Sequence, residues 1–189
     1  LDWLQTSWAW GWTRLLDRVD SCGHELLGSS TTGRVTLIGH SSGGVMLRPY
    51  LSDEEFLGRR YGGASVCDRL ISLGSPHQAK RATPLRVLVN RRFPGCPESE
   101  RVDYVAVAGQ LNLASDTASA FSRLSASNSY RQISFDKDVE GDGLVPVASA
   151  LLRDARPVVL PDTAHGGLFG STWYGSKDRI GAWWGALSS

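Results

Sequence analysis

Short apolar runs alternate with stretches of helical periodicity along most of this chain. Four runs rich in β-branched or aliphatic residues have the length and composition of buried strands, at positions 34–38, 70–73, 104–108 and 158–160. Apolar residues recur at helical spacing in three other stretches, at 12–27, just after Thr83-Pro84, and at 177–187. Strands that alternate with helices predict an α/β architecture with a mainly parallel sheet.

The strongest local motif is Gly39-His40-Ser41-Ser42-Gly43-Gly44, which follows the first predicted strand and precedes a predicted helix. A Gly-x-Ser-x-Gly motif at a strand-to-helix turn is typical of a nucleophilic serine. Gly39 and Gly43 lack a Cβ, so we expect them to permit a sharp turn and close packing of helix on strand. A chance match and a phosphate-binding turn are the alternatives, and the second lacks the Gly-Lys-Ser/Thr of a nucleotide P-loop.

Three motifs resemble those of one enzyme superfamily. Gly39-His40-Ser41-Ser42-Gly43-Gly44 resembles the nucleophile elbow of α/β-hydrolase lipases and esterases. Residues 70–77 resemble the strand and turn that follow it, and residues 141–146 resemble the acid loop. Residues 173–176 are similar to a motif of lipase-like hydrolases from cyanobacteria and plant plastids, which are relatives of the GPI inositol-deacylase group. The resemblance implies a doubly wound, mostly parallel α/β-hydrolase sheet.

A catalytic set follows from the order of the residues along the chain. A serine hydroxyl needs a base at neutral pH, and the base needs a carboxylate to orient it. Ser41, Asp142 and His165 come in the α/β-hydrolase order, each in a loop after a predicted strand. We expect His165 Nε2 to bond Ser41 Oγ and Asp142 to contact the other ring nitrogen. The alternatives are Asp136, Asp138 or Asp162 as the acid and His24, His40 or His77 as the base.

The oxyanion hole and the start of the chain raise a second expectation. The backbone N–H of Ser42 matches one oxyanion donor of the family. The second family donor follows a strand upstream of the elbow, and no residues before Leu1 supply that strand. We therefore expect an N-terminally incomplete hydrolase in which the strand at 34–38 lies at a sheet edge, with one side unpaired. His40 and His77 are candidates for substrate contact.

Length, charge and cysteine content narrow the possible domain organisation, binding partners and compartment of the protein. A chain of 189 residues predicts a single domain over 1–189, with cap or lid segments at 78–100 and 110–131. The net charge of +1 gives no electrostatic support for nucleic-acid binding. Three cysteines without metal-ligand spacing predict free thiols in a reducing compartment, the cytoplasm, or a plastid in a plant or alga. No metal or organic cofactor is expected.

The predicted activity is hydrolysis of a carboxylic ester through an acyl-enzyme on Ser41, with an acyl ester or lipid as substrate. A basic, amphipathic helix after Thr83-Pro84 is either a segment that contacts a lipid surface or an ordinary crossover helix with a solvated basic side. Two other functions stay open: a non-catalytic α/β-hydrolase scaffold that binds a lipid or protein, and an acyltransferase in which an alcohol replaces water.

Overall fold

The computed structural model describes residues 9–79, 83–134 and 139–186. Its strands are β1 (Val35–His40), β2 (Cys67–Leu73), β3 (Asp103–Gln110) and β4 (Arg156–Pro161). Its helices are α2 (Ala9–Leu27), α3 (Ser42–Leu51), α4 (Pro84–Arg92), α5 (Ala120–Ser134), α6 (Val147–Ala150) and α7 (Lys177–Gly185), with a 3₁₀ turn at Gly63–Ser65. All four strands predicted from the apolar runs are present.

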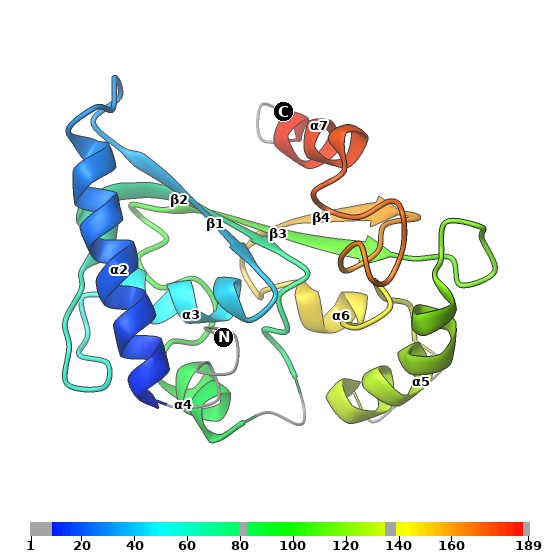
Figure 1. Ribbon diagram of the computed structural model, residues 1–189. Coiled ribbons are helices and arrows are strands. Elements are labelled where there is room, and N and C mark those ends of the chain that lie inside the picture. Colours follow the sequence, from blue (N-terminus) through cyan, green and yellow to red (C-terminus); the bar gives the residue numbers. More distant parts are fainter. Residues whose placement is uncertain (1–8, 80–82, 135–138, 187–189) are drawn as a thin grey trace.

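The four strands form one parallel sheet in the order β1-β2-β3-β4. Ile38 lies opposite Ile71, and Ile71 lies opposite Val105, so the strand ends are in step. Helices α3, α4 and α6 lie on one side of the sheet and α7 lies on the other (Figure 1). This is the predicted doubly wound arrangement, and it gathers the loops after the carboxyl ends of the strands at one edge.

Strand β1 lies at an edge of this sheet. Among the described residues it pairs with β2 alone, as the sequence predicted for one side of 34–38. Leu37 is buried, whereas the side chain of Ile38 is 49% exposed on the opposite face. A strand with this apolar composition therefore has one well-covered face and one partly open face.

The core is split between the two faces of the sheet because successive strand residues point in opposite directions. One cluster joins α2, α3 and α4 to the sheet and contains Trp12, Leu16, Tyr50, Leu70 and Val89. The other packs under α7 and contains Ile71, Val105, Tyr174 and Trp183. Burying each large apolar side chain contributes roughly 1.5–3 kcal/mol, so the neighbours Leu70 and Ile71 anchor opposite layers.

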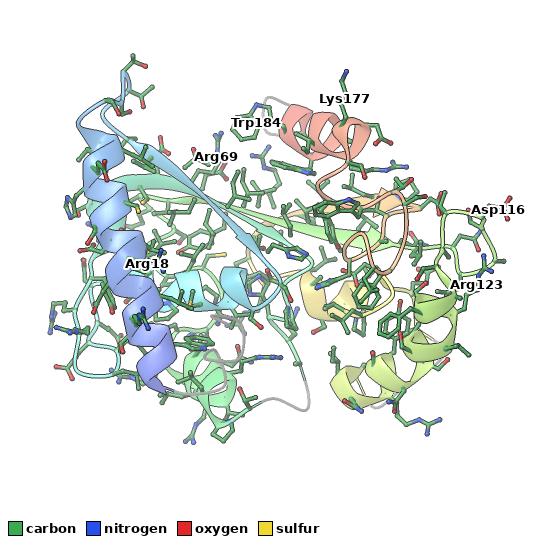
Figure 2. All side chains as sticks on the ribbon, viewed as in Figure 1. Arg18, Arg69, Asp116, Arg123, Lys177 and Trp184 are labelled. Atoms are coloured by element: carbon green, nitrogen blue, oxygen red, sulfur yellow. The ribbon has the colours of Figure 1, made fainter. Side chains whose placement is uncertain are left out.

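Two predictions about single elements are wrong. The sequence suggests a short return strand at Ile133 and Phe135, but Ile133 belongs to α5, and residue 135 lies outside the described part of the chain. The apolar spacing of the last helix places Trp184 inward, but Trp184 projects from α7 and is 49% exposed (Figure 2). Helix α4 connects β2 to β3, as the crossover alternative predicts, and packs against α3 with Leu85 and Val89 buried.

Candidate active site

Ser41 occupies a strained turn between the end of β1 and the start of α3. Its backbone angles are φ 55° and ψ −128°, a region that residues other than glycine rarely adopt. The Ser41 N–H donates to the Leu73 carbonyl at 2.9 Å, which ties the turn to the neighbouring strand. Backbone strain of this kind costs of order 1–3 kcal/mol and is concentrated at functional sites.

Close packing of α3 on β1 explains two of the glycines in this motif. A Cβ on Gly39 would lie 2.6 Å from the backbone of Gly44, which leaves no room for alanine. A Cβ on Gly44 would lie 2.8 Å from Ser72 Cβ. Gly43, expected to share this role, has nothing within 4 Å of the same position. The expectation for Gly43 is therefore wrong, because the close approach falls one residue later.

Asp142 and His165 form a buried pair. The distance from His165 Nδ1 to Asp142 Oδ2 is 2.8 Å, as expected for these two groups. The Asp142 Oδ1 atom accepts the backbone N–H groups of Leu144 and Val145 at 3.0 and 2.7 Å. Since Nδ1 donates its proton to the carboxylate, Nε2 is the ring nitrogen left to accept one.

The loops that contain Asp142 and His165 are also joined through their backbones. The His165 N–H donates to the Asp142 carbonyl at 2.7 Å, so the two loops are joined at both levels. The rival acid Asp162 is engaged elsewhere, where it accepts the Thr117 hydroxyl at 2.8 Å. The rivals Asp136 and Asp138 lie outside the described residues.

Tyr174 completes the surroundings of Asp142 and was missed as a site residue by the sequence analysis. Its hydroxyl donates to Asp142 Oδ2 at 2.9 Å and accepts the Gly109 N–H at 2.6 Å. Burial, and then the charge of Asp142, raises the pKa of Tyr174 well above its ordinary value, so the hydroxyl stays a donor. The sequence signal that could have pointed to this residue was the Trp173-Tyr174-Gly175-Ser176 motif. Without the fold, that motif does not show that Tyr174 contacts Asp142.

The histidines have different environments. His40 Nε2 donates to the His165 carbonyl at 2.8 Å, and the two ring centroids lie 4.7 Å apart. Burial, and then the neighbouring His165, lowers the pKa of His40. His24, an alternative for the base, is exposed on α2, with Nε2 3.8 Å from Asp20 Oδ1.

The prediction that His77 contacts the substrate needs correction. Its side chain is buried, with 2% exposed, and lines a second cavity together with Arg48. It is not among the residues that line the Ser41 cavity. The turn after β2 therefore places the ring in the second cavity and not beside Ser41.

A cavity of about 580 Å³ opens beside Ser41. Its polar side contains His40, Ser41, Ser42 and His165. Its apolar side consists of residues from α2, α3, α5 and two loops: Trp12, Leu15, Met46, Phe121, Leu144, Leu168 and Phe169. Within the part of the chain that is described, no group of three or more His, Cys, Asp or Glu residues is arranged to hold a metal ion.

One expected contact is not formed in this structure. Ser41 and His165 line the same cavity, yet no hydrogen bond joins their side chains in the described residues. His165 is held by Asp142 on one side and packs against His40 and Phe169, at ring distances of 4.7 and 5.6 Å. The imidazole is therefore fixed by its own neighbours and not by the serine.

The second donor of the oxyanion hole, which the sequence analysis placed outside this sequence, stays a prediction.

Comparison with known proteins supports the fold. A lipase from Bacillus licheniformis, BlEst2 in its mature form, superposes with a TM-score of 0.55 at 17% sequence identity. The fold is that of the α/β hydrolases. The match covers 78% of this chain and 64% of the lipase, so this chain spans less than two thirds of that protein. No family model and no curated protein matches the sequence.

Among the described helices, none is both long and apolar enough to cross a membrane. Cys22, Cys67 and Cys96 are free thiols, as predicted.

Proposed function

We propose that this protein is a serine hydrolase of carboxylic esters, of the lipase or esterase type. Ser41 is the nucleophile, His165 the general base and Asp142 the residue that orients the base. The observation that carries this proposal is the buried Asp142–His165 pair, with its 2.8 Å hydrogen bond, facing a cavity that also contains Ser41. Its fold, shared with a bacterial lipase, supports the same reaction class.

The reaction begins with attack of Ser41 Oγ on the ester carbonyl while His165 Nε2 takes the hydroxyl proton. The negative charge of the tetrahedral intermediate develops beside the Ser42 N–H, at the first turn of α3, where the helix dipole is favourable. The ester C–O bond then breaks, and His165 returns the proton to the departing alcohol. Water repeats the cycle on the acyl-enzyme, which releases the carboxylic acid and restores Ser41.

The lining of the cavity suits an acyl chain. Its walls are mostly aliphatic and aromatic, and the polar groups converge at the Ser41 end. Phe121 and Leu168 belong to this wall, and 47% and 65% of their side chains are exposed. Exposed apolar side chains at the rim favour contact with an aggregated lipid substrate.

A non-catalytic scaffold is the second candidate. The observation that favours it is the absence of a hydrogen bond between Ser41 and His165 among the described residues. Catalytic hydrogen bonds are often long or poorly aligned before substrate binds, and the two side chains share a cavity. The two candidates differ in one property, the reactivity of Ser41.

A fluorophosphonate probe distinguishes them. The folded wild-type protein is expected to be labelled covalently, and Ser41→Ala should abolish labelling. His165→Ala should slow labelling by about 10²-fold or more, because the general base is lost. Ser42→Ala is the matched control, since its backbone N–H is kept and labelling should persist. Absence of labelling in folded wild-type protein favours the scaffold, and labelling of Ser41→Ala places the nucleophile elsewhere.

A further inference from the structure

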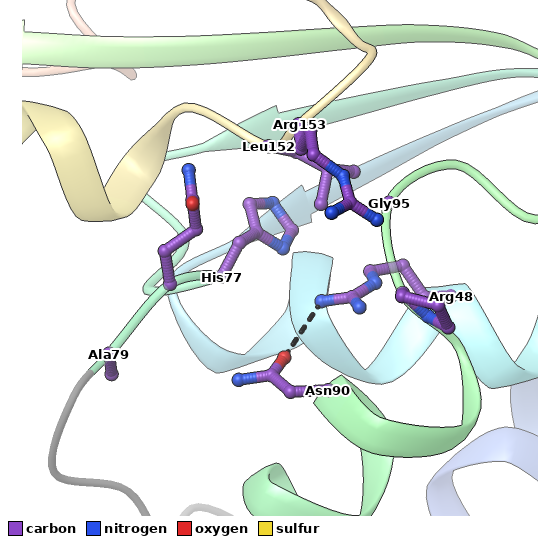
Figure 3. Close-up of a pocket in the computed structure, with 9 residues that line it drawn as sticks. Arg48, His77, Ala79, Asn90, Gly95, Leu152 and Arg153 are labelled. Carbon is purple, nitrogen blue, oxygen red and sulfur yellow. Dashed lines mark hydrogen bonds between the residues drawn. The ribbon is translucent and has the colours of Figure 1, made fainter.

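A second cavity, of about 320 Å³, lies between α3, α4 and the segment after α6. Arg48 from α3, Asn90 from α4, His77 from the turn after β2, and Arg153 line it (Figure 3). It shares no lining residue with the Ser41 cavity. The proposed hydrolysis makes no use of these four side chains.

Arg48 is a buried cation, and its charge interacts with no carboxylate among the described residues. Only 2% of the residue is exposed, and its guanidinium donates to Asn90 Oδ1 at 3.1 Å and to the Phe93 carbonyl. Its Nε has no hydrogen-bond partner in the part of the chain that the structure describes. The neighbouring acidic groups are the Cys96 thiol and the Tyr104 hydroxyl, and burial raises the pKa of each, so both are neutral near pH 7. A buried charge without a counter-charge is strongly unfavourable.

His77 is also incompletely satisfied. The residue is 2% exposed, and neither ring nitrogen has a hydrogen-bond partner within residues 9–79, 83–134 and 139–186. Burial, and then the charge of Arg48, lowers its pKa to about 3, so the ring is neutral and carries one N–H donor. Buried polar groups are normally paired, and two adjacent exceptions, at Arg48 and His77, indicate a missing acceptor.

The rim of the cavity adds further donors. Asn90 uses its Oδ1 to accept Arg48, which leaves its amide NH₂ group as a donor. The Arg153 side chain is 67% exposed, and its Nε lies 3.3 Å from Asp154 Oδ2, which leaves the terminal nitrogens for another partner. In Figure 3 the guanidinium groups of Arg48 and Arg153 both lie to one side of the His77 ring. The residues that carry these groups therefore come from four separate segments and line one cavity.

We propose that this cavity binds a small oxyanion, a phosphate or carboxylate group, between Arg48, His77 and Arg153. The anion supplies the counter-charge that Arg48 lacks and accepts the N–H of His77. The planar donors of arginine suit both oxyanions, since each presents two oxygens in one plane. The open side at Arg153 admits a ligand larger than the anionic group itself.

Titration of the whole chain with inorganic phosphate, followed by calorimetry at constant ionic strength, tests the site. A parallel titration with acetate tests for carboxylate binding, and chloride is the reference salt. Wild type should bind phosphate, acetate or both saturably. Arg153→Ala should bind at least about tenfold more weakly, because a charge-assisted hydrogen bond is lost, and Arg48→Met should not bind. Arg18→Ala is the matched control, because it removes an exposed arginine that points away from α2 (Figure 2).

Two results overturn the proposal: no saturable binding of either anion by wild type, or equal affinity in wild type and Arg153→Ala. The exposed Arg153 side chain makes that variant decisive even where Arg48→Met does not fold. Binding of phosphate without acetate identifies a phosphate site, and the reverse identifies a carboxylate site. Ser41→Ala should bind the anion as wild type does, so this outcome is independent of the proposed hydrolase activity.

Discussion

At the scale of single residues, the neighbours of His40, His77 and His165 distinguish their environments. His165 is buried but donates to Asp142, so its second nitrogen stays available for chemistry. His40 donates from Nε2 to the His165 carbonyl, and its ring packs beside that of His165. His77 has no hydrogen-bond partner among the residues that the structure describes, and it lines the second cavity together with Arg48. All three residues are histidines, so only their neighbours distinguish their environments.

The buried His77 predicts a measurable pH dependence of stability. Its pKa falls from the ordinary 6.5 to about 3 on folding, through burial and the charge of Arg48. Between these values the unfolded chain binds a proton that the folded chain does not. The free energy of unfolding therefore falls as pH drops below 6.5, by up to about 1.4 kcal/mol per pH unit.

The His77→Gln variant lacks this titrating group. Its free energy of unfolding should therefore decline less steeply than that of wild type between pH 6.5 and 4. Urea unfolding at several pH values measures both curves. His24→Gln, at an exposed position on α2, is the matched control for the loss of a histidine. Parallel curves for wild type and His77→Gln would contradict the prediction.

At the scale of elements, β1 and α3 act as one unit around Ser41. The backbone of Gly39 meets that of Gly44 where helix and strand cross, and Ser41 is forced into its positive φ between them. The buried length of α3, from Gly44 to Leu51, fixes the helix against the sheet and so fixes the serine. The strain at Ser41 is sustained by packing that lies several residues away.

Two alanine substitutions in the same motif should therefore differ. Gly39→Ala should lower the free energy of unfolding by about 1–3 kcal/mol, because its Cβ has no space beside the Gly44 backbone. Gly43→Ala should be neutral or stabilise by about 0.5–1 kcal/mol, since its position is open and alanine favours helix. Urea unfolding compares the two. Equal effects would show that the crossing is looser than the structure indicates.

At the scale of the whole molecule, the Ser41 cavity is assembled from distant parts of the chain. Trp12 comes from α2, Phe121 from α5, and Phe169 from the loop that also carries His165. Phe121 packs on Phe169 at 5.3 Å, and Phe169 packs on His165 at 5.6 Å, both edge to face. The wall proposed for the acyl chain is thus continuous with the proposed base.

This continuity predicts a chain-length effect under the proposed ester hydrolysis. Phe121→Ser should lower kcat/KM for an octanoate ester about tenfold while changing that for an acetate ester little, because only the longer chain reaches this wall. Leu124→Ser is the matched control: its residue lies on the same helix, is 85% exposed and does not line the cavity. Hydrolysis of p-nitrophenyl esters measures both, and an equal loss on the two esters would contradict the prediction.

The sequence by itself determined the features that depend on local pattern. The β-branched run before Gly39 and the apolar run at 70–73 predict strands because side-chain periodicity and turn chemistry act over a few residues. The order Ser41, Asp142, His165 follows from the same motifs, but the strand predicted before Asp142 is wrong, because residues up to Ser134 belong to α5. Ser41 and His165 do lie just after the ends of β1 and β4. Parallel strands then bring those ends to one edge of the sheet.

Only the tertiary structure decided which side chains meet. Tyr174 reaches Asp142, His77 turns toward Arg48, and Gly44 rather than Gly43 lies at the helix–strand crossing. These contacts join elements that are far apart in the chain, and they depend on crossing distances of a few ångströms. Sequence periodicity fixes the face on which a residue lies, whereas packing between elements fixes its neighbour. Burial and hydrogen bonding, which set the chemistry of each group, are therefore properties of the assembled fold.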